Sequence, residues 1–172
     1  MDYTAENRPV VSVVMGSDSD LSVMKEATFL LEEFDVPHEL VLASAHRSPE
    51  RTRRFSEGAA ARGVKVIIAG AGAAAHLAGV IASQTVLPVI GVPIDSSPLK
   101  GLDALLATAQ MPGGVPVASM ALGKAGAKNG ALMAVRILAL EDPSLRAKME
   151  AYIENMARGI EEKQEKLRSK QE

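Results

Sequence analysis

The 172-residue chain contains no cysteine and no tryptophan, and only 3% of its residues are aromatic. Without cysteine it can form neither a disulfide nor a thiolate metal site, and it has no cysteine nucleophile. No apolar run approaches the roughly 20 residues that span a bilayer, and the polar start Met1 to Pro9 lacks the apolar centre of a signal peptide. The sequence therefore predicts a cytoplasmic protein that does not enter a membrane.

A basic surface is also missing, because the formal net charge is −2. A net charge of this sign does not indicate a nucleic-acid-binding protein, which typically carries an excess of basic residues. The chain is 47% hydrophobic, which at this length suffices for one compact core of aliphatic residues, alanine and methionine. We expect a single α/β domain over residues 1–172, with no linker, repeat or second domain.

Short apolar runs alternate with amphipathic segments along the chain. The runs predict strands at 10–15, 38–42, 65–69, 89–92 and 116–120. Helices are predicted at 21–34, 49–62, 102–109 and 127–140, with a short one ending at 83. Strands separated by helices imply right-handed crossovers, a central five-stranded parallel sheet and helices on both faces. The predicted fold is doubly wound.

The last segment, residues 143–168, predicts a long helix after the sheet is complete. Its apolar residues form one stripe among many charges. Such a helix is expected to pack on a neighbouring subunit. The stripe consists of Leu145, Met149, Tyr152, Met156 and Ile160.

The first predicted strand ends at Gly16, and a polar turn leads into the first helix. Ligands of open parallel sheets bind at such junctions, beside the free amides of the helix. A carboxylate repels phosphate but accepts hydrogen bonds from sugar hydroxyls. We therefore interpret Ser17 as phosphate-binding and Asp20 as ribose-binding. The alternative, that Asp18, Ser19 and Asp20 only cap the helix, stays open.

The second strand leads into Ser44-Ala45-His46-Arg47-Ser48-Pro49, at the same edge of the predicted sheet. Histidine exchanges protons near neutral pH, and arginine suits phosphate or carboxylate. His46 is therefore the candidate catalytic residue. His38, inside a strand, is interpreted as structural.

The third strand opens into a Gly and Ala loop, 70–75, with His76 near the start of the next helix. Small residues let backbone amides approach a flat or anionic ligand. The spacing of Gly70, Gly72 and Ala75 also fits a dinucleotide fingerprint. That match falls on the third strand rather than the first, and an NAD site would leave His46 and Arg47 unused. An NAD-binding oxidoreductase is thus a lesser alternative, and His76 could instead cap its helix.

Walker loops, clusters of histidine and acids at metal spacing, and Gly-x-Ser-x-Gly elbows are absent from the sequence. The predicted chemistry is proton transfer without a metal or a tightly held organic cofactor.

Five motifs, taken together and in order, resemble the class I N5-carboxyaminoimidazole ribonucleotide mutases of bacterial purine (IMP) synthesis, within the aminoimidazole ribonucleotide (AIR) carboxylase family. The resemblance runs from about Val10 to Leu140. The motifs are Val14-Met15-Gly16-Ser17-Asp18-Ser19-Asp20, Ser44 to Pro49, Ala69 to Gly72 with Ala75-His76-Leu77, Leu87 to Pro93, and Gln110 to Pro116.

The resemblance implies a three-layer flavodoxin-like fold, a homo-octamer, and an isomerase that interconverts N5-carboxyaminoimidazole ribonucleotide and 4-carboxy-5-aminoimidazole ribonucleotide. It implies that His46 carries the proton. It also implies a set of substrate-binding residues: Ser17, Asp18, Asp20, Ser44, Ala45, Arg47, Gly70, Ala71, Gly72 and His76.

The chain departs from the family pattern in the segment 72–79, where alanines replace one glycine and one proline. Alanine suits the glycine position only if φ there is negative. The class II carboxylases, which add free carbon dioxide to aminoimidazole ribonucleotide, usually carry Ser-Ala-His-Lys. Arg47 and the Gly70-Ala71-Gly72 segment favour class I. A non-catalytic nucleotide-binding module is the third hypothesis.

Overall fold

The computed structural model describes residues 8–170, so the polar start at 1–7 and residues 171–172 lie outside the described part of the chain. Two compact units divide the chain, one up to Ala134 and one from Val135 onward. The prediction of a single domain stays a prediction.

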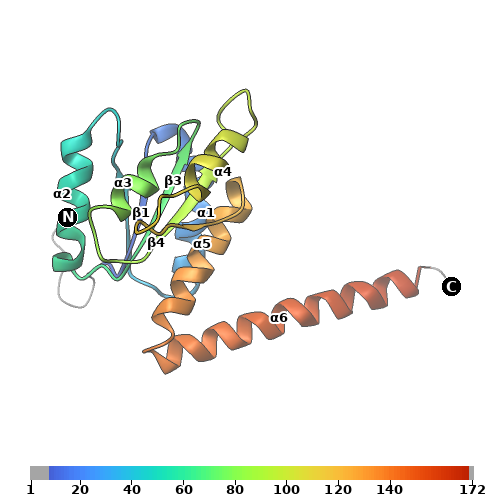
Figure 1. Ribbon diagram of the computed structural model, residues 1–172. Helices are drawn as coiled ribbons and strands as arrows, with labels where there is room; N and C mark the ends of the chain where they lie inside the picture. Colours follow the sequence, from blue (N-terminus) through green and yellow to red (C-terminus); the bar gives the residue numbers. More distant parts are fainter. Residues whose placement is uncertain (1–7, 171–172) are drawn as a thin grey trace. The chain divides into compact units, whose positions relative to one another are not determined.

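A five-stranded parallel sheet forms the centre of the first unit, with the strand order β2-β1-β3-β4-β5 (Figure 1). This order is that of flavodoxin-like folds, so the predicted fold class is confirmed. The strand order reverses between β1 and β3, because β2 lies on one side of β1 and the later strands on the other; such folds bind ligands at this point. The strands are β1 Val11–Met15, β2 His38–Leu42, β3 Val66–Gly72, β4 Val89–Ile94 and β5 Ala118–Ser119.

Helices cover both faces of this sheet. Those of the first unit are α1 Leu21–Glu33, α2 Pro49–Ala59, α3 Leu77–Ala82, α4 Leu102–Ala109 and the first part of α5 Gly123–Leu138, with short 3-10 turns at Asp18–Asp20 and Ala60–Arg62. The second unit holds the end of α5 and the helix α6 Pro143–Arg168. None of the helices in the described part of the chain is both long and apolar enough to cross a membrane.

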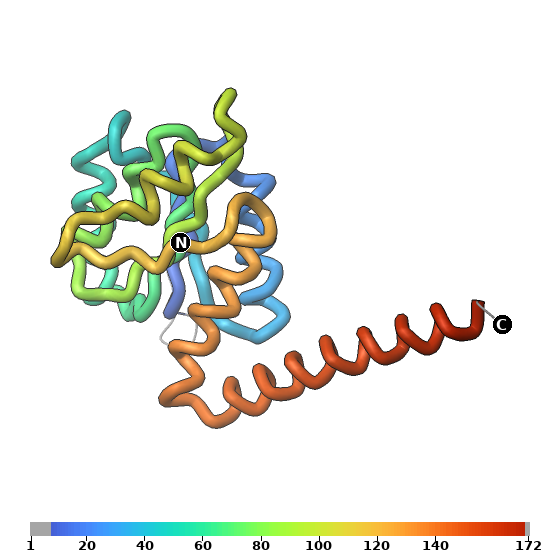
Figure 2. The backbone as a smooth tube through the Cα atoms, turned by 45° about the vertical axis from the view of Figure 1, so that its right-hand side comes forward, coloured from blue at the N-terminus to red at the C-terminus, as the bar shows by residue number. Residues whose placement is uncertain are grey.

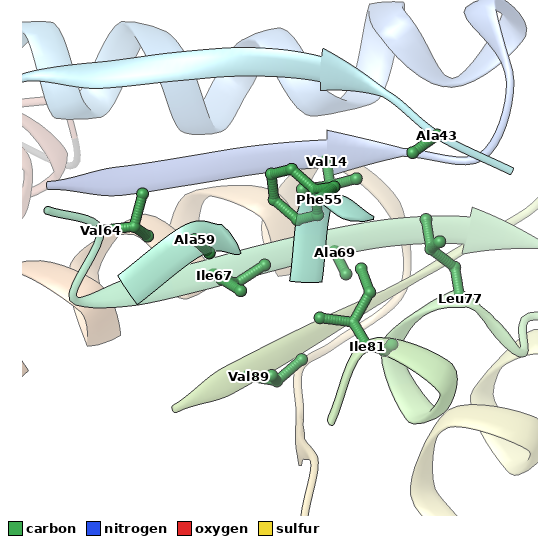
Figure 3. Packing of buried hydrophobic residues seen from close by; sticks show 11 residues of the cluster. Val14, Ala43, Phe55, Ala59, Val64, Ile67, Ala69, Leu77, Ile81 and Val89 are labelled. Carbon is green, nitrogen blue, oxygen red and sulfur yellow. The ribbon is translucent and has the colours of Figure 1, made fainter. Parts of the chain in front are cut away.

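One face of the sheet packs against α2 and α3 in a continuous apolar cluster (Figure 3). Phe55 of α2 and Ile81 of α3 lie with Val14, Ile67 and Ala69 of the strands. Valine and isoleucine suit a strand buried on both faces, which explains why β1 and β3 are mostly apolar.

The opposite face carries α1 and the first part of α5, which lie side by side in both views of the chain (Figure 2). Glu26 of α1 pairs with Lys124 and Lys128 of α5, at 3.2 and 3.3 Å. The Cβ position of Gly130 in α5 lies 3.4 Å from Ile68 and Ile90, so this helix sits close to the sheet.

The predicted bounds of β2 and α4 are confirmed, but those of β3, β4 and β5 are not. β3 continues to Gly72, because Gly70, Ala71 and Gly72 pair with β4. The first half of the predicted loop at 70–75 is therefore strand. β5 is only two residues long; Pro116, at its predicted start, has no N–H to offer a sheet ladder.

The α6 helix begins at an N-cap, Asp142, whose side chain accepts hydrogen bonds from Ser144 N–H and Leu145 N–H. Leu145 and Met149 of its apolar stripe are buried. Met156 and Ile160, further along, are exposed by 49% and 63%. The second half of the stripe thus lacks a cover from the described residues of one chain.

Ala73 lies directly after β3 and has φ = +50°, so the condition of a negative φ for alanine at this position is not met. A left-handed conformation costs an L-residue roughly 1–2 kcal/mol. The chain keeps this conformation without the glycine that would relieve it.

Replacing Ala73 with glycine is expected to raise the free energy of unfolding by up to about 1 kcal/mol, because the gain at positive φ exceeds the entropic cost of glycine. Ala74→Gly is the matched control, since Ala74 is not among the described residues with positive φ. The control should lose about 0.5–1 kcal/mol. Urea denaturation of both variants measures this, and equal losses would contradict the assignment of strain.

Candidate active site

A hollow lies at the carboxyl ends of β1, β2 and β3, where the loops after these strands meet. It gathers eight of the residues that the sequence predicted for the site. They are Ser17, Asp20, Ser44, Ala45, His46, Arg47, Ala71 and Gly72.

A second hollow adjoins the first and shares Gly16, Ser17, Ser44 and Arg47 with it. The first has a volume of about 160 Å³ and the second about 330 Å³. Pockets for drug-sized ligands have roughly 300–1,000 Å³. The first hollow alone is smaller than this range, so a drug-sized ligand bound there must extend into the second.

The turn after β1 is a capping box. Ser19 N–H donates to Ser17 Oγ at 3.4 Å, and Ser17 N–H donates to Asp20 Oδ2 at 3.1 Å. Asp20 and Ser17 therefore cap this turn, and both residues also line the hollow, so the choice between capping and ligand binding stays open. A Cβ on Gly16 would meet no atom closer than 3.9 Å, so packing within the chain does not demand glycine there.

Asp20 is only 4% exposed. Burial raises the pKa of its carboxyl above the usual 3.8, although the Ser17 N–H bond and the nearby Arg47 charge oppose the shift. Asp20 is thus a partly desolvated acid held beside a cation.

Hydrogen bonds hold the turn after β2 rigidly against the turn after β1. Arg47 Nη2 donates to Gly16 O at 2.8 Å, and Arg47 N–H donates to Ser44 Oγ at 3.2 Å. Ser44 N–H donates to Ser48 Oγ, and Ser48 Oγ donates back to Ser44 O. Ser48 is the N-cap residue of α2, as predicted, but its hydroxyl makes no cap bond.

His46 and His76 come from different loops and meet in the structure. His46 Nε2 and His76 Nδ1 are 2.9 Å apart, and the two rings are nearly perpendicular, at 77°. One of these nitrogens donates and the other accepts, so a single proton lies between the two rings. His76 occupies the N-cap position of α3, but its ring makes no cap bond, so the ring is not a helix cap.

The remaining predicted residues lie at the margins of the site. Asp18 lines the second hollow only. Gly70 lines neither of the two hollows, because it is inside β3 with its carbonyl accepting Gly16 N–H at 3.2 Å. Gly70 and Gly72 are strand residues, which argues against the dinucleotide fingerprint, since that motif needs its glycines in a turn after the strand.

Ser96, after β4, lines the first hollow and was not predicted. A Cβ on Gly72 would lie 1.8 Å from Ser96 Oγ, so glycine lets this hydroxyl approach β3. The only signal in the sequence is the position of Ser96 after a strand end. Within residues 8–170, histidines and acids form no group of three that could hold a metal ion.

The sequence pattern of AIR carboxylase matches residues 10–159. The chain belongs to this family. It is 56% identical to the N5-carboxyaminoimidazole ribonucleotide mutase of Pyrococcus horikoshii, over 93% of this chain and 89% of that protein. It is 49% identical to the mutase of the same name in Bacillus subtilis, over 93% of this chain and 99% of that protein.

The solved structure of Treponema denticola PurE superposes with a TM-score of 0.84 and is 29% identical, covering 93% of this chain and 99% of that one. The fold and the family therefore agree.

The raised pKa of Asp20 predicts a pH-dependent effect of Asp20→Asn. Asp20 ionises more readily in the unfolded chain, so wild-type protein loses stability as the pH rises from the unfolded pKa through the folded one. Asparagine has no such loss. The variant should unfold at higher urea than wild type at pH 7, with the difference vanishing near pH 3. The prediction would be contradicted if the stability of Asp20→Asn minus that of wild type were smaller at pH 7 than at pH 3.

Proposed function

We propose that this chain interconverts N5-carboxyaminoimidazole ribonucleotide and 4-carboxy-5-aminoimidazole ribonucleotide, with His46 as the proton carrier. The reaction is an isomerisation in purine biosynthesis. The main support is that His46, Ser17 and Arg47 line the same hollow. The chain that holds them is 56% identical to a named mutase over 93% of its length.

The reaction needs one group that both gives and takes a proton. As the bond between the exocyclic nitrogen and the carboxylate breaks, carbon dioxide is released and His46 protonates that nitrogen. Carbon dioxide then bonds to ring carbon four, and the proton on that carbon passes to His46. His76, hydrogen-bonded to His46, would hold the ring in place between the two transfers.

The nucleotide would lie along both hollows. The second hollow, with Ser17, Asp18 and Arg47, would take the ribose phosphate. Arg47 Nη1 makes no hydrogen bond within the described residues, so it remains free to donate. Asp20 uses Oδ2 for Ser17 N–H, which leaves Oδ1 to accept a ribose hydroxyl.

The imidazole and its carboxylate would lie in the first hollow, beside His46. Small residues there would let the flat ring reach the strand ends. Carbon dioxide must be retained between the two steps, and a site closed to water favours this. The residues proposed to face this part of the substrate are Ser44, Ala45, Ala71 and Gly72, all of which line the first hollow.

We also propose a cytoplasmic homo-octamer that binds no nucleic acid, in which α6 packs on a neighbouring subunit. The exposed apolar residues of α6, with Met156 49% exposed, support this packing, and the net charge of −2 offers little to a polyanion. An octamer would sediment with about eight times the 18.1 kDa mass of one chain.

His46→Asn is expected to lower the isomerisation rate by roughly 10²–10⁴-fold, because general acid–base catalysis contributes about that much. The assay follows 4-carboxy-5-aminoimidazole ribonucleotide to its N5-carboxy isomer without ATP, metal or bicarbonate. His38→Asn is the control, since among the described residues the His38 ring bonds to the Val36 carbonyl alone, outside both hollows.

Three other outcomes would count against the proposal. Equal rates for both variants would remove His46 from the chemistry. Decarboxylation reversed by high bicarbonate would indicate the class II carboxylase. A wild-type protein that binds the ribonucleotide without turnover would indicate a binding module.

A further inference from the structure

Arg51 belongs to the second hollow, although neither its position in the sequence nor the family motifs single it out. It lies in the first turn of α2, just after the turn that carries His46 and Arg47. The residues that line this hollow with it are Gly16, Ser17, Asp18, Leu42, Ser44, Arg47 and Ser48.

The guanidinium of Arg51 is oriented but not neutralised. Its Nε donates to the Leu42 carbonyl at 2.7 Å. Within residues 8–170, its two terminal nitrogens make no hydrogen bond and no ion pair. Arg53, two residues further along the same helix, is instead paired with Glu50 and Glu57. Two fixed, unused donors in a fork suit the oxygens of a phosphate.

Charge balance in the two hollows requires a second cation. Asp18 and Asp20 contribute two negative charges to the lining of these hollows, whereas Arg47 contributes one positive charge. A phosphate monoester adds roughly −1.5 to −2 at pH 7. With Arg47 alone, that anion would enter a site that already has a net negative charge. Arg51 makes the empty site neutral, with two arginines and two aspartates.

The two hollows also differ in chemistry along their length. His46, Ala71 and Gly72 line only the first, whereas Asp18, Ser48 and Arg51 line only the second. A ligand that places its reacting ring beside His46 therefore extends its other end toward Arg51.

We propose that Arg51 binds the 5′-phosphate of the substrate together with Arg47, and so determines the preference for a phosphorylated substrate. This inference rests on the proposed function for the identity of the ligand. Arg51 is a positioning residue, because it contacts the phosphate and not the reacting atoms.

The test compares Arg51→Gln with Arg54→Gln. Arg54 lies one turn further along α2, lines neither of the two hollows, and pairs with no described residue. Loss of a charged hydrogen bond should raise KM for 4-carboxy-5-aminoimidazole ribonucleotide roughly tenfold or more in Arg51→Gln. The value of kcat should stay within about twofold, and Arg54→Gln should match wild type. Arg51→Lys keeps the charge without the fork and should recover part of the loss.

Calorimetry with ribose 5-phosphate makes the test independent of turnover. Arg51→Gln should weaken this binding by the same factor as KM, and the loss should shrink at high salt. A wild-type enzyme that isomerises its substrate, together with an Arg51→Gln variant equal to Arg54→Gln in both KM and ribose 5-phosphate affinity, would overturn the inference alone. A wild-type protein without turnover whose ribose 5-phosphate binding still depends on Arg51 would support it and remove only the proposed reaction.

Discussion

Parallel pairing of β1 with both β2 and β3 is the constraint on which the site depends. Met15 is level with Leu42 on one side and with Gly70 on the other. The strands β1 and β2 therefore end at the same level and lead into the turns of Ser17 and His46, beside the last residues of β3. A shift of register by one residue would turn every side chain of a strand to the other face.

Charge is the second organising feature. Burial makes ionisation of Asp20 costly, yet its carboxylate caps the turn after β1. Arg47 connects that turn to the next one through the Gly16 carbonyl. These bonds fix the backbone around the hollow before any ligand is present, which is what proton transfer and retention of carbon dioxide require. Because the folded protein raises the pKa of Asp20, the free energy of unfolding falls as the pH rises from the unfolded pKa of this carboxyl through its folded pKa.

Local patterns predicted those parts of the structure that local forces determine. The apolar run of β2 and the helical periodicity of α4 were sufficient for their bounds. The Gly-Ala-Gly end of β3 has low strand propensity, and its pairing with β4, together with that of Gly70 with Met15 of β1, makes it a strand.

Contacts between distant residues escaped prediction for the same reason. The positive φ of Ala73, the meeting of His46 and His76 across 30 residues, and the places of Ser96 and Arg51 depend on tertiary packing. Ser17, Asp20, His46 and Arg47 could be found because strand ends in a parallel sheet converge, so sequence position alone brought them together.

Isotope retention tests the central claim, intramolecular transfer of the carboxyl group, most directly. The substrate is 4-carboxy-5-aminoimidazole ribonucleotide with ¹³C in its carboxyl group, incubated with the enzyme in unlabelled bicarbonate. Mass spectrometry then follows the N5-carboxy product over the first turnovers. We expect the product to keep the label, because carbon dioxide stays in the hollow beside His46. Product with the isotope content of the dissolved bicarbonate would contradict it.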